Sequence, residues 1–158
     1  MPDRAGAPGL RPGVRIGVDV GSVRIGVART DPAAILAVPV ETVPRGDADL
    51  ARIAEIVAEQ DAVEVVVGLP LGMSGRPGPA AAAARAFAGA LAGVVAPVPV
   101  RLVDERLSTV AATRAMRAAG RSDKSSRRVV DQAAAVEIVQ YAVDTERATG
   151  HAPGLVVE

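Results

Sequence analysis

Three carboxylates stand in otherwise apolar stretches of the sequence, where burying an acidic side chain is costly. Asp19 interrupts the Val/Ile pattern of residues 14–20, Glu105 follows the apolar run 98–103, and Asp131 lies in an Ala/Val-rich stretch. An uncompensated buried carboxylate costs several kcal/mol, so each has to be neutralised, paired with a cation or bound to a metal ion. Clustered acids repel one another, and hard divalent cations with oxygen ligands relieve that repulsion.

Asp131 gives the strongest of the three signals. On a helix that turns about 100° per residue, it shares a face, within about 40°, with Ala135, Ile138 and Ala142. This places an acid on the apolar side of the helix. The alternative is that Asp131 lies in the first turn and caps the helix.

Asp19 and Glu105 are each expected near the end of a hydrophobic strand. Asp19 belongs to the first strand, which we expect at the centre of a sheet; the alternative is an acid that faces solvent beside Gly21. Glu105 follows another strand at its carboxyl end, where open α/β sheets place their ligand sites. Its alternative is a helix cap or an ion pair with Arg106. The three acids can meet only if the last helix packs across the sheet near both strand ends.

Such an acidic cluster would suit Mg²⁺ or Mn²⁺. Two such ions about 3.5–4 Å apart can activate water and stabilise the leaving oxygen of a phosphodiester, without help from histidine or cysteine. The chain has no cysteine and a single histidine, His151, between glycine and proline residues near the C-terminus. This excludes disulfides, a thiolate nucleophile and cysteine-ligated zinc or iron–sulfur sites.

Positive charge is concentrated just before Asp131, where it would bring phosphate-binding side chains to the mouth of the acidic site. The candidate nucleic-acid-binding residues in this stretch are Arg114, Arg117, Arg121, Lys124, Arg127 and Arg128. Arg24 is a further candidate, as are Ser74 and Arg76 in the loop 70–79. The alternative is an ordinary solvated helix face.

The composition limits the class of protein. A chain of 158 residues with 49% hydrophobic and 23% charged residues fits one globular domain. Its 18 basic residues balance 18 acidic ones, so a nucleic acid has to be met by a local patch rather than by an overall field. Aromatic residues make up 1%, which argues against modules that stack bases on rings. With no recognisable export signal and no run of about 18 apolar residues, we expect a cytoplasmic protein without a membrane span.

The hydrophobic pattern predicts a three-stranded meander followed by alternating helices and strands. The expected strands cover 14–20, 24–30, 35–42, 63–69 and 98–103, and the expected helices cover 47–60, 80–91, 109–119 and 128–146. Asp47 is available to cap the first helix, and Pro39 favours an edge position for the third strand. We therefore predict an α/β fold with a five-stranded mixed sheet and helices on both faces.

The same pattern predicts one folded domain with two loose ends. Residues 1–13 are rich in glycine and proline and are expected to form a flexible arm. Residues 14–146 carry the predicted strands and helices, and residues 147–158 are expected to form a flexible tail.

The glycines near Asp19 do not complete a nucleotide-binding motif. Gly21 and Gly26 have the spacing of a Walker A loop, but the Lys-Ser/Thr pair that this loop requires is absent. The string DVGS at 19–22 resembles the first phosphate loop of the actin, heat-shock and sugar-kinase ATPases. Those proteins enclose ATP between two lobes, and this chain has room for one. An ATPase stays open as an alternative, and it requires stabilisation by ATP.

Four ordered blocks between about residues 14 and 144 resemble the YqgF/RuvX family. They are IGVDVGSVRIGVARTD, VVVGLPLGMSGRPGP, LVDERLSTVAA and VDQAAAVEIVQ. The resemblance implies a ribonuclease-H-like fold and a nuclease that processes the 5′ end of precursor 16S ribosomal RNA. The family is also described as Holliday-junction-resolvase-like. Position by position, its acidic residues fall on Asp19, Glu105 and Asp131.

The sequence departs from the family pattern at three positions. Val23 stands where a lysine is frequent, and in the loop 70–79 Gly72 and Ser74 replace a common asparagine and aspartate. These changes alter the substrate contacts that the loop can offer, and they leave the acidic set intact.

We therefore predict a divalent-metal-dependent endonuclease that acts on structured nucleic acid, with precursor ribosomal RNA as the expected substrate. In this hypothesis Asp19, Glu105 and Asp131 hold the metal ions and the basic stretch positions the backbone. A second hypothesis keeps the chemistry but has a homodimer cut a four-way DNA junction. A third is a non-catalytic assembly factor that binds ribosomal RNA or protein through residues 114–128.

Overall fold

The strands and helices follow the predicted order along the chain. The computed structural model describes residues 10–70, 78–104 and 124–158, and for residues 124–131 it describes the backbone only. The expected helix 109–119 lies outside these residues. The strands are β1 (Arg15–Val20), β2 (Arg24–Thr30), β3 (Ala37–Pro44), β4 (Glu64–Leu69), β5 (Val100–Asp104) and β6 (Leu155–Val156), and the helices are α1 (Asp49–Glu59), α2 (Pro79–Val95) and α4 (Lys124–Thr149).

The strands form one mixed sheet in the order β3-β2-β1-β4-β5-β6. β1 pairs antiparallel with β2 and parallel with β4, and the parallel pairing continues to β5. β1 is therefore internal, as predicted for the strand that carries Asp19, and β3 lies at an edge, as Pro39 favours. The predicted number of five strands is one too few. The extra strand, β6, has two residues, and so short a segment leaves no periodic signal in the sequence.

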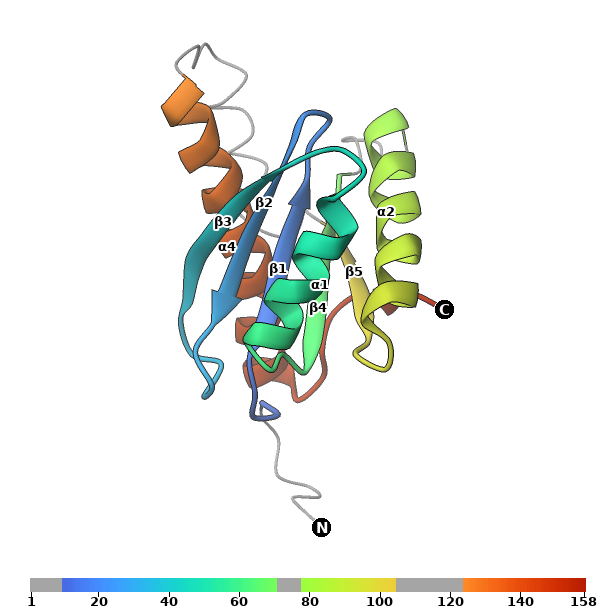
Figure 1. Ribbon diagram of the computed structural model, residues 1–158. Helices are drawn as coiled ribbons and strands as arrows, with labels where there is room; N and C mark the ends of the chain where they lie inside the picture. Colours follow the sequence, from blue (N-terminus) through green and yellow to red (C-terminus); the bar gives the residue numbers. More distant parts are fainter. Residues whose placement is uncertain (1–9, 71–77, 105–123) are drawn as a thin grey trace.

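Helices cover both faces of the sheet, α1 and α2 on one side and α4 on the other (Figure 1). Alternation along β1 divides its side chains between these layers. Ile16 and Val18 join the core under α1 and α2, so Arg15, Gly17 and Asp19 face α4. The predicted α/β architecture with helices on both faces is confirmed, and α4 is the helix that covers the face with the buried acid.

Two helix ends differ from the prediction. Asp47 does not cap α1, because the residue before the helix is Ala48 and no side chain caps this end. Asp49 instead accepts a hydrogen bond from the Gly46 backbone N–H at 3.2 Å and pairs with Arg45. α4 is longer than the predicted 128–146, since a helix that packs along its middle can propagate into polar flanks without an apolar repeat.

The segments expected to form a loose arm and tail take part in tertiary contacts. Arg11 bonds Glu64 and Glu146, which lie far along the chain. After α4, the Pro153 carbonyl accepts a hydrogen bond from Arg101 at 3.2 Å, and β6 pairs with β5. The interactions of the fold therefore extend beyond residues 14–146 on both sides, because ion pairs and edge pairing join segments that carry no hydrophobic pattern of their own.

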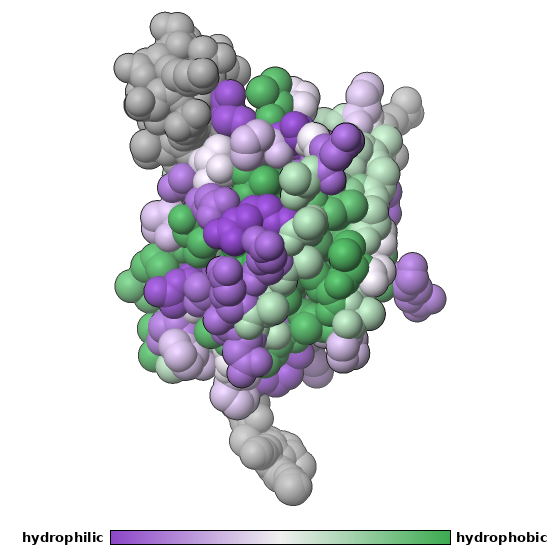
Figure 2. Space-filling view, viewed as in Figure 1, coloured by the Kyte–Doolittle hydropathy of each residue, from purple (hydrophilic) through white to green (hydrophobic). Residues whose placement is uncertain are grey.

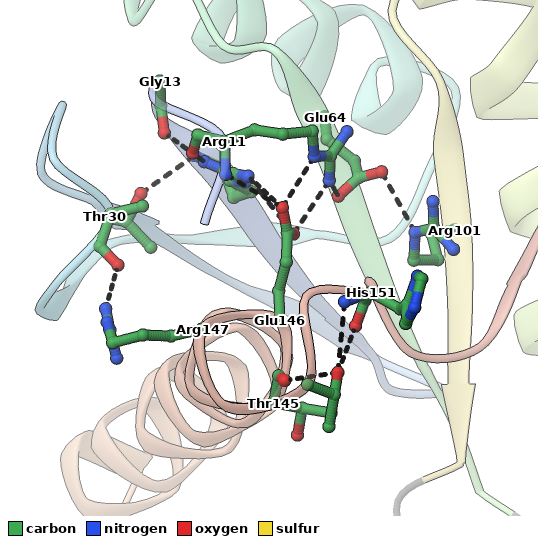
Figure 3. A network of polar contacts seen from close by, with 12 residues as sticks. Arg11, Gly13, Thr30, Glu64, Arg101, Thr145, Glu146, Arg147 and His151 are labelled. Carbon is green, nitrogen blue, oxygen red and sulfur yellow. Dashed lines mark hydrogen bonds and ion pairs between the residues drawn. The ribbon is translucent and has the colours of Figure 1, made fainter. Parts of the chain in front are cut away.

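A buried ion network closes the end of the sheet where β1 begins (Figure 3). Arg15 is 0% exposed, Glu64 2% and Glu146 3%. Glu146 accepts from Arg11 Nε at 2.7 Å and from Arg15 Nη2 at 3.2 Å, and Glu64 pairs with Arg11 at 3.2 Å and Arg101 at 3.0 Å. The network ties the N-terminal segment to β1, β4, β5 and the C-terminal part of α4.

The network makes stability depend on pH through Glu146. Burial alone would raise the pKa of this carboxyl, but hydrogen bonds and charge from Arg11 and the charge of Arg15 outweigh burial and lower the pKa to about 2. The folded-state pKa therefore lies below the ordinary value of 4.5. As pH falls from about 4.5 to about 2, the unfolded chain takes up a proton before the folded chain does, so the stabilisation is lost in that window.

We expect the free energy of unfolding to fall by roughly 3 kcal/mol through Glu146 as pH is lowered across this window. Urea unfolding at several pH values from neutral down to about 2 measures the slope. Asp31 and Glu41 also have lowered pKa values, through backbone and Arg52 hydrogen bonds respectively. The comparison is therefore with Glu146→Gln, which should lose part of the acid dependence. An identical slope in both proteins would show that Glu146 does not carry it.

The outer surface of α2 differs from the rest of the face that it shares with α1. Figure 2 shows largely hydrophilic surface over α1, mixed surface over β3 and hydrophobic surface over α2. Arg85 is the one charged residue of α2, whose remaining positions are mostly alanine and glycine. α2 therefore offers little positive charge to bind phosphates. Among the described helices, none is long and apolar enough to cross a membrane.

Candidate active site

Asp19 lies on the internal strand β1, one residue before its end, and is 1% exposed. It pairs in register with Gly26 of β2, and its side chain faces α4. The alternative of an acid that faces solvent is therefore wrong. The strands on either side hold this acid in place, and its oxygen atoms are of the type that a hard cation prefers.

α4 crosses the α4-facing side of β1 at very short range. A Cβ atom built on Gly17 would lie 2.6 Å from the Ala135 carbonyl oxygen and 2.7 Å from Val139 Cβ. Both distances are shorter than real contacts, so only glycine fits at position 17 without a shift of the helix. Gly17 thus sets how closely α4 approaches the strand that carries Asp19.

We expect Gly17→Ala to lower the free energy of unfolding by roughly 1–3 kcal/mol, because the added methyl group overpacks the contact between β1 and α4. Gly89→Ala is the matched control. A Cβ atom on Gly89 would meet nothing within 4 Å, so this change in a helix should stabilise the protein by about 0.4–1 kcal/mol. Urea unfolding measures both, and equal effects of the two variants would contradict the close approach at Gly17.

α4 runs antiparallel to β1 (Figure 1). Arg15 contacts Glu146 near the C-terminal end of α4, whereas Gly17 lies against Ala135, eleven residues earlier in the helix. Two residues of strand advance about 6.6 Å and four residues of helix advance about 6 Å. Two residues after Gly17 is Asp19, and four residues before Ala135 is position 131. If α4 followed β1 closely, this stepping would bring position 131 toward the level of Asp19, and this is the placement that we expect.

Position 131 lies well inside α4. The helix is already formed at Lys124, seven residues earlier, so the alternative that Asp131 caps the helix from its first turn is wrong. The residues predicted to share its face are buried, with Ala135 0%, Ile138 2% and Ala142 4% exposed. The buried face of α4 is thus the predicted one, while the side chain of Asp131 itself lies outside the described side chains.

The other candidate residues divide into three groups. Those outside the described residues are Glu105, Ser74, Arg76, Arg114, Arg117 and Arg121, as is Gly72 of the loop. Lys124, Arg127 and Arg128 lie in the first turns of α4, where the backbone alone is described. Arg24 begins β2 and is half-buried, and its carbonyl accepts a hydrogen bond from the Gly21 N–H at 2.9 Å. β5 ends at Asp104, directly before Glu105.

The described part of this site fits a hard divalent cation in its donor chemistry. Asp19 provides a buried acidic side chain, and Asp131 lies four residues before Ala135, the α4 residue that approaches Gly17. Oxygen donors of this kind suit Mg²⁺ and Mn²⁺. No group of three acidic or histidine side chains that could hold a metal occurs among the described residues, and the side chains of Glu105 and Asp131, two of the three predicted ligands, are not among those described.

Sequence reasoning missed two polar contacts of the α4 interface. Gln132 Nε2 donates to Thr42 Oγ1 of β3 at 2.8 Å, and Gln140 accepts from the Ala37 N–H at 2.8 Å. Gln132 had a detectable signal, because it follows Asp131 directly on a half-buried helix. Thr42 had none, since a threonine in an edge strand is ordinary.

Comparisons with known proteins show which family this chain resembles. The family model RuvX, described as Holliday junction resolvase, matches residues 13–145. A protein of Nocardioides sp. named "Putative pre-16S rRNA nuclease" is 62% identical over 154 residues, which cover 94% of this chain and 99% of that protein. A protein of Streptomyces coelicolor with the same name is 54% identical over 158 residues and covers 99% and 95% of the two chains.

Among solved structures, Thermus thermophilus RuvC in complex with a Holliday junction substrate matches with a TM-score of 0.55 and 17% identity, over 90% of this chain and 99% of that one. A second structure of Thermus thermophilus RuvC gives a TM-score of 0.53 and 16% identity. At this identity the likeness concerns the fold, and it confirms the predicted ribonuclease-H-like class.

Proposed function

The chain belongs to the RuvX family, and we propose that it is a divalent-metal-dependent endonuclease that processes the 5′ end of precursor 16S ribosomal RNA. Relatives that span nearly the whole chain carry the name of a pre-16S rRNA nuclease. A nuclease is a hydrolase of phosphodiester bonds. We place its action in the cytoplasm, where ribosomal precursors are processed in bacteria.

The observation that carries this proposal is Asp19, an acid that is 1% exposed on the internal strand β1, whose neighbour Gly17 lies against Ala135 of α4. We assign Asp19, Asp131 and Glu105 as the residues that hold one or two Mg²⁺ or Mn²⁺ ions. Bound there, the ions supply the Lewis acid that activates water and stabilises the leaving oxygen. In this proposal both aspartates come from regular elements, β1 and α4, which would save the cost of ordering them around a substrate.

The basic residues have a different role in the proposal. Arg24, Arg114, Arg117, Arg121, Lys124, Arg127 and Arg128 are assigned to the nucleic-acid backbone. Phosphate contacts of this kind fix the position of a strand and carry no sequence information. We therefore expect affinity to fall steeply with salt, and we expect the choice of cleavage position to depend on the shape of the RNA.

Cleavage of two substrates side by side tests the proposal. The protein is incubated at equal salt with two substrates, each with and without about 5 mM Mn²⁺. One is a precursor 16S fragment that includes the mature 5′ end, and the other is a synthetic four-way DNA junction. We expect cleavage of the RNA near the mature end that requires the ion. Binding of RNA without cleavage, and without any effect of Mn²⁺ on melting temperature, would favour a non-catalytic assembly factor instead.

Junction resolution is the second candidate function, favoured by the description of the family that matches residues 13–145. Symmetric cutting of a four-way junction needs two active sites, and therefore a dimer. Cleavage of the junction in preference to the RNA, by a protein that sediments as a dimer, would support this function. A monomer that leaves the junction uncut would argue against it.

A further inference from the structure

A cross-strand row links the buried acid to the edge of the sheet. Asp19 of β1 pairs with Gly26 of β2, and Gly26 pairs with Thr42 of β3. The neighbours Ile25 and Val43 belong to the core under α1 and α2, so this row faces α4. Neighbouring strands are about 4.8 Å apart, which places the Thr42 backbone about 10 Å from that of Asp19, with a glycine that adds no side chain between them.

Among the described side chains, a directional bond ties α4 to this row. Gln132 Nε2 donates to Thr42 Oγ1 at 2.8 Å, and Gln132 directly follows Asp131. Successive residues of a helix are about 100° apart. Viewed down the helix axis, Ala135, which contacts Gly17 of β1, lies between positions 131 and 132. Gln132 therefore points to the β3 side of the helix, and position 131 lies toward β1.

Resting on the function proposed above, we propose that the Gln132–Thr42 hydrogen bond is a positioning pair that fixes the rotation and register of α4 so that Asp131 lies level with Asp19. Neither residue touches the ion or the substrate in this proposal. Both act through the position of the neighbouring acid.

Packing alone defines this position poorly. The α4 side of the core is built largely of small residues, among them Ala28, Ala37, Ala134, Ala135 and Ala142. Small side chains interdigitate less than large ones, so a small slide of the helix changes few contacts. A hydrogen bond is lost within a few tenths of an ångström and so resists that slide. A misplacement of about 1 Å at a reacting centre can cost about 100-fold in rate.

Gln140 provides a matched comparison on the same helix. It lies two turns further along and also bonds the β3 side, accepting from the Ala37 N–H and donating to the Ile35 carbonyl, each at 2.8 Å. Its contacts anchor α4 far from Asp19. Comparing substitutions of the two glutamines thus separates an effect on the metal site from an effect on the attachment of α4 to β3.

The test compares Gln132→Ala, Thr42→Val, Thr42→Ser and Gln140→Ala. Manganese affinity is measured by electron paramagnetic resonance of free Mn²⁺, and kcat and KM are measured on the precursor RNA fragment. Loss of a group that orients a metal ligand costs about 10–100-fold in affinity or activity. We expect that loss in Mn²⁺ affinity and in kcat, with unchanged KM, for Gln132→Ala and Thr42→Val. Thr42→Ser keeps the hydroxyl and should retain wild-type values.

Two further results make the proposal falsifiable. The double variant Gln132→Ala/Thr42→Val should lose no more than Thr42→Val alone, because Thr42→Val already removes the bond that Gln132→Ala removes. Gln140→Ala should keep wild-type Mn²⁺ affinity and kcat, even if its melting temperature falls. Should Gln132→Ala fail to fold, the nearly isosteric Thr42→Val gives the same answer.

The outcomes distinguish this proposal from the function on which it rests. Wild-type protein that neither binds Mn²⁺ nor cleaves RNA would overturn both. Active wild-type protein with unaffected Gln132→Ala and Thr42→Val variants would overturn the positioning role and leave the nuclease function standing. Equal losses in Gln132→Ala and Gln140→Ala would also overturn it, because the effect would then reflect general attachment of α4.

Discussion

Asp19→Asn and Asp131→Asn are each expected to lower phosphodiester cleavage by roughly 1,000-fold or more, while binding of the RNA changes little. A divalent ion contributes several kcal/mol to stabilisation of transition-state charge. Each loss of about 1.4 kcal/mol lowers the rate tenfold. An amide keeps the shape of the carboxylate but is a much weaker ligand for a hard cation. Single-turnover cleavage and filter binding at fixed salt measure the two quantities separately.

The same substitutions also have an expected effect on stability. Asp19 is 1% exposed, and asparagine has nearly the same size and shape, so Asp19→Asn should leave the metal-free protein folded. Stabilisation by millimolar Mn²⁺, which the wild type gains by binding the ion in the native state only, should be lost. Asp144→Asn is the control, because this exposed acid of α4 pairs with Arg147. Unchanged cleavage by folded Asp131→Asn protein would remove Asp131 from the site.

Glu146→Gln is expected to lower the free energy of unfolding by about 3–5 kcal/mol, the largest stability effect of any single substitution proposed here. The change leaves the Arg15 guanidinium, which is 0% exposed, without its buried counter-charge. Burial lowers the pKa of Arg15, and the charge of Glu146 opposes that effect. For a chain of this size the loss corresponds to a fall in melting temperature of roughly 6–20 °C.

Asp144→Asn serves as the control for this prediction as well. Its side chain is 54% exposed in the ion pair with Arg147, so removing the charge should change the free energy of unfolding by about 0.5 kcal/mol or less. Urea unfolding at pH 7 compares the two variants directly. A loss below about 1 kcal/mol for Glu146→Gln would mean that the network at the start of β1 contributes no more than a surface ion pair.

Much of the fold was readable from the sequence because it follows hydrophobic periodicity. The alternation of β1 predicted both its strand and the placement of Asp19 on one face, and the helical spacing around Asp131 predicted which face of α4 is buried. Asp19 and Asp131 stood out because a charge in an apolar pattern is costly. Those features are local, so they can be recognised before the tertiary structure is known.

The remaining features depend on contacts between distant segments. β6 forms because a short C-terminal segment meets the free edge of β5, and Arg15 is buried because Glu146 arrives from a helix 131 residues later. The pairing of Thr42 with Gln132 likewise joins residues 90 apart in sequence. No periodicity or propensity encodes such pairs in either segment alone. Asp47 is the opposite case, because a residue type that favours helix caps was present in the sequence but Ala48 is the N-cap residue of α1.

A crystal of the protein soaked in Mn²⁺, with anomalous diffraction measured to locate the ion, tests the central claim most directly. Our account predicts anomalous density between β1 and α4, with carboxylate oxygens of Asp19 and Asp131 at bonding distance from the same ion. Density elsewhere, or two carboxylates directed to separate parts of the surface without a shared ion, would contradict it.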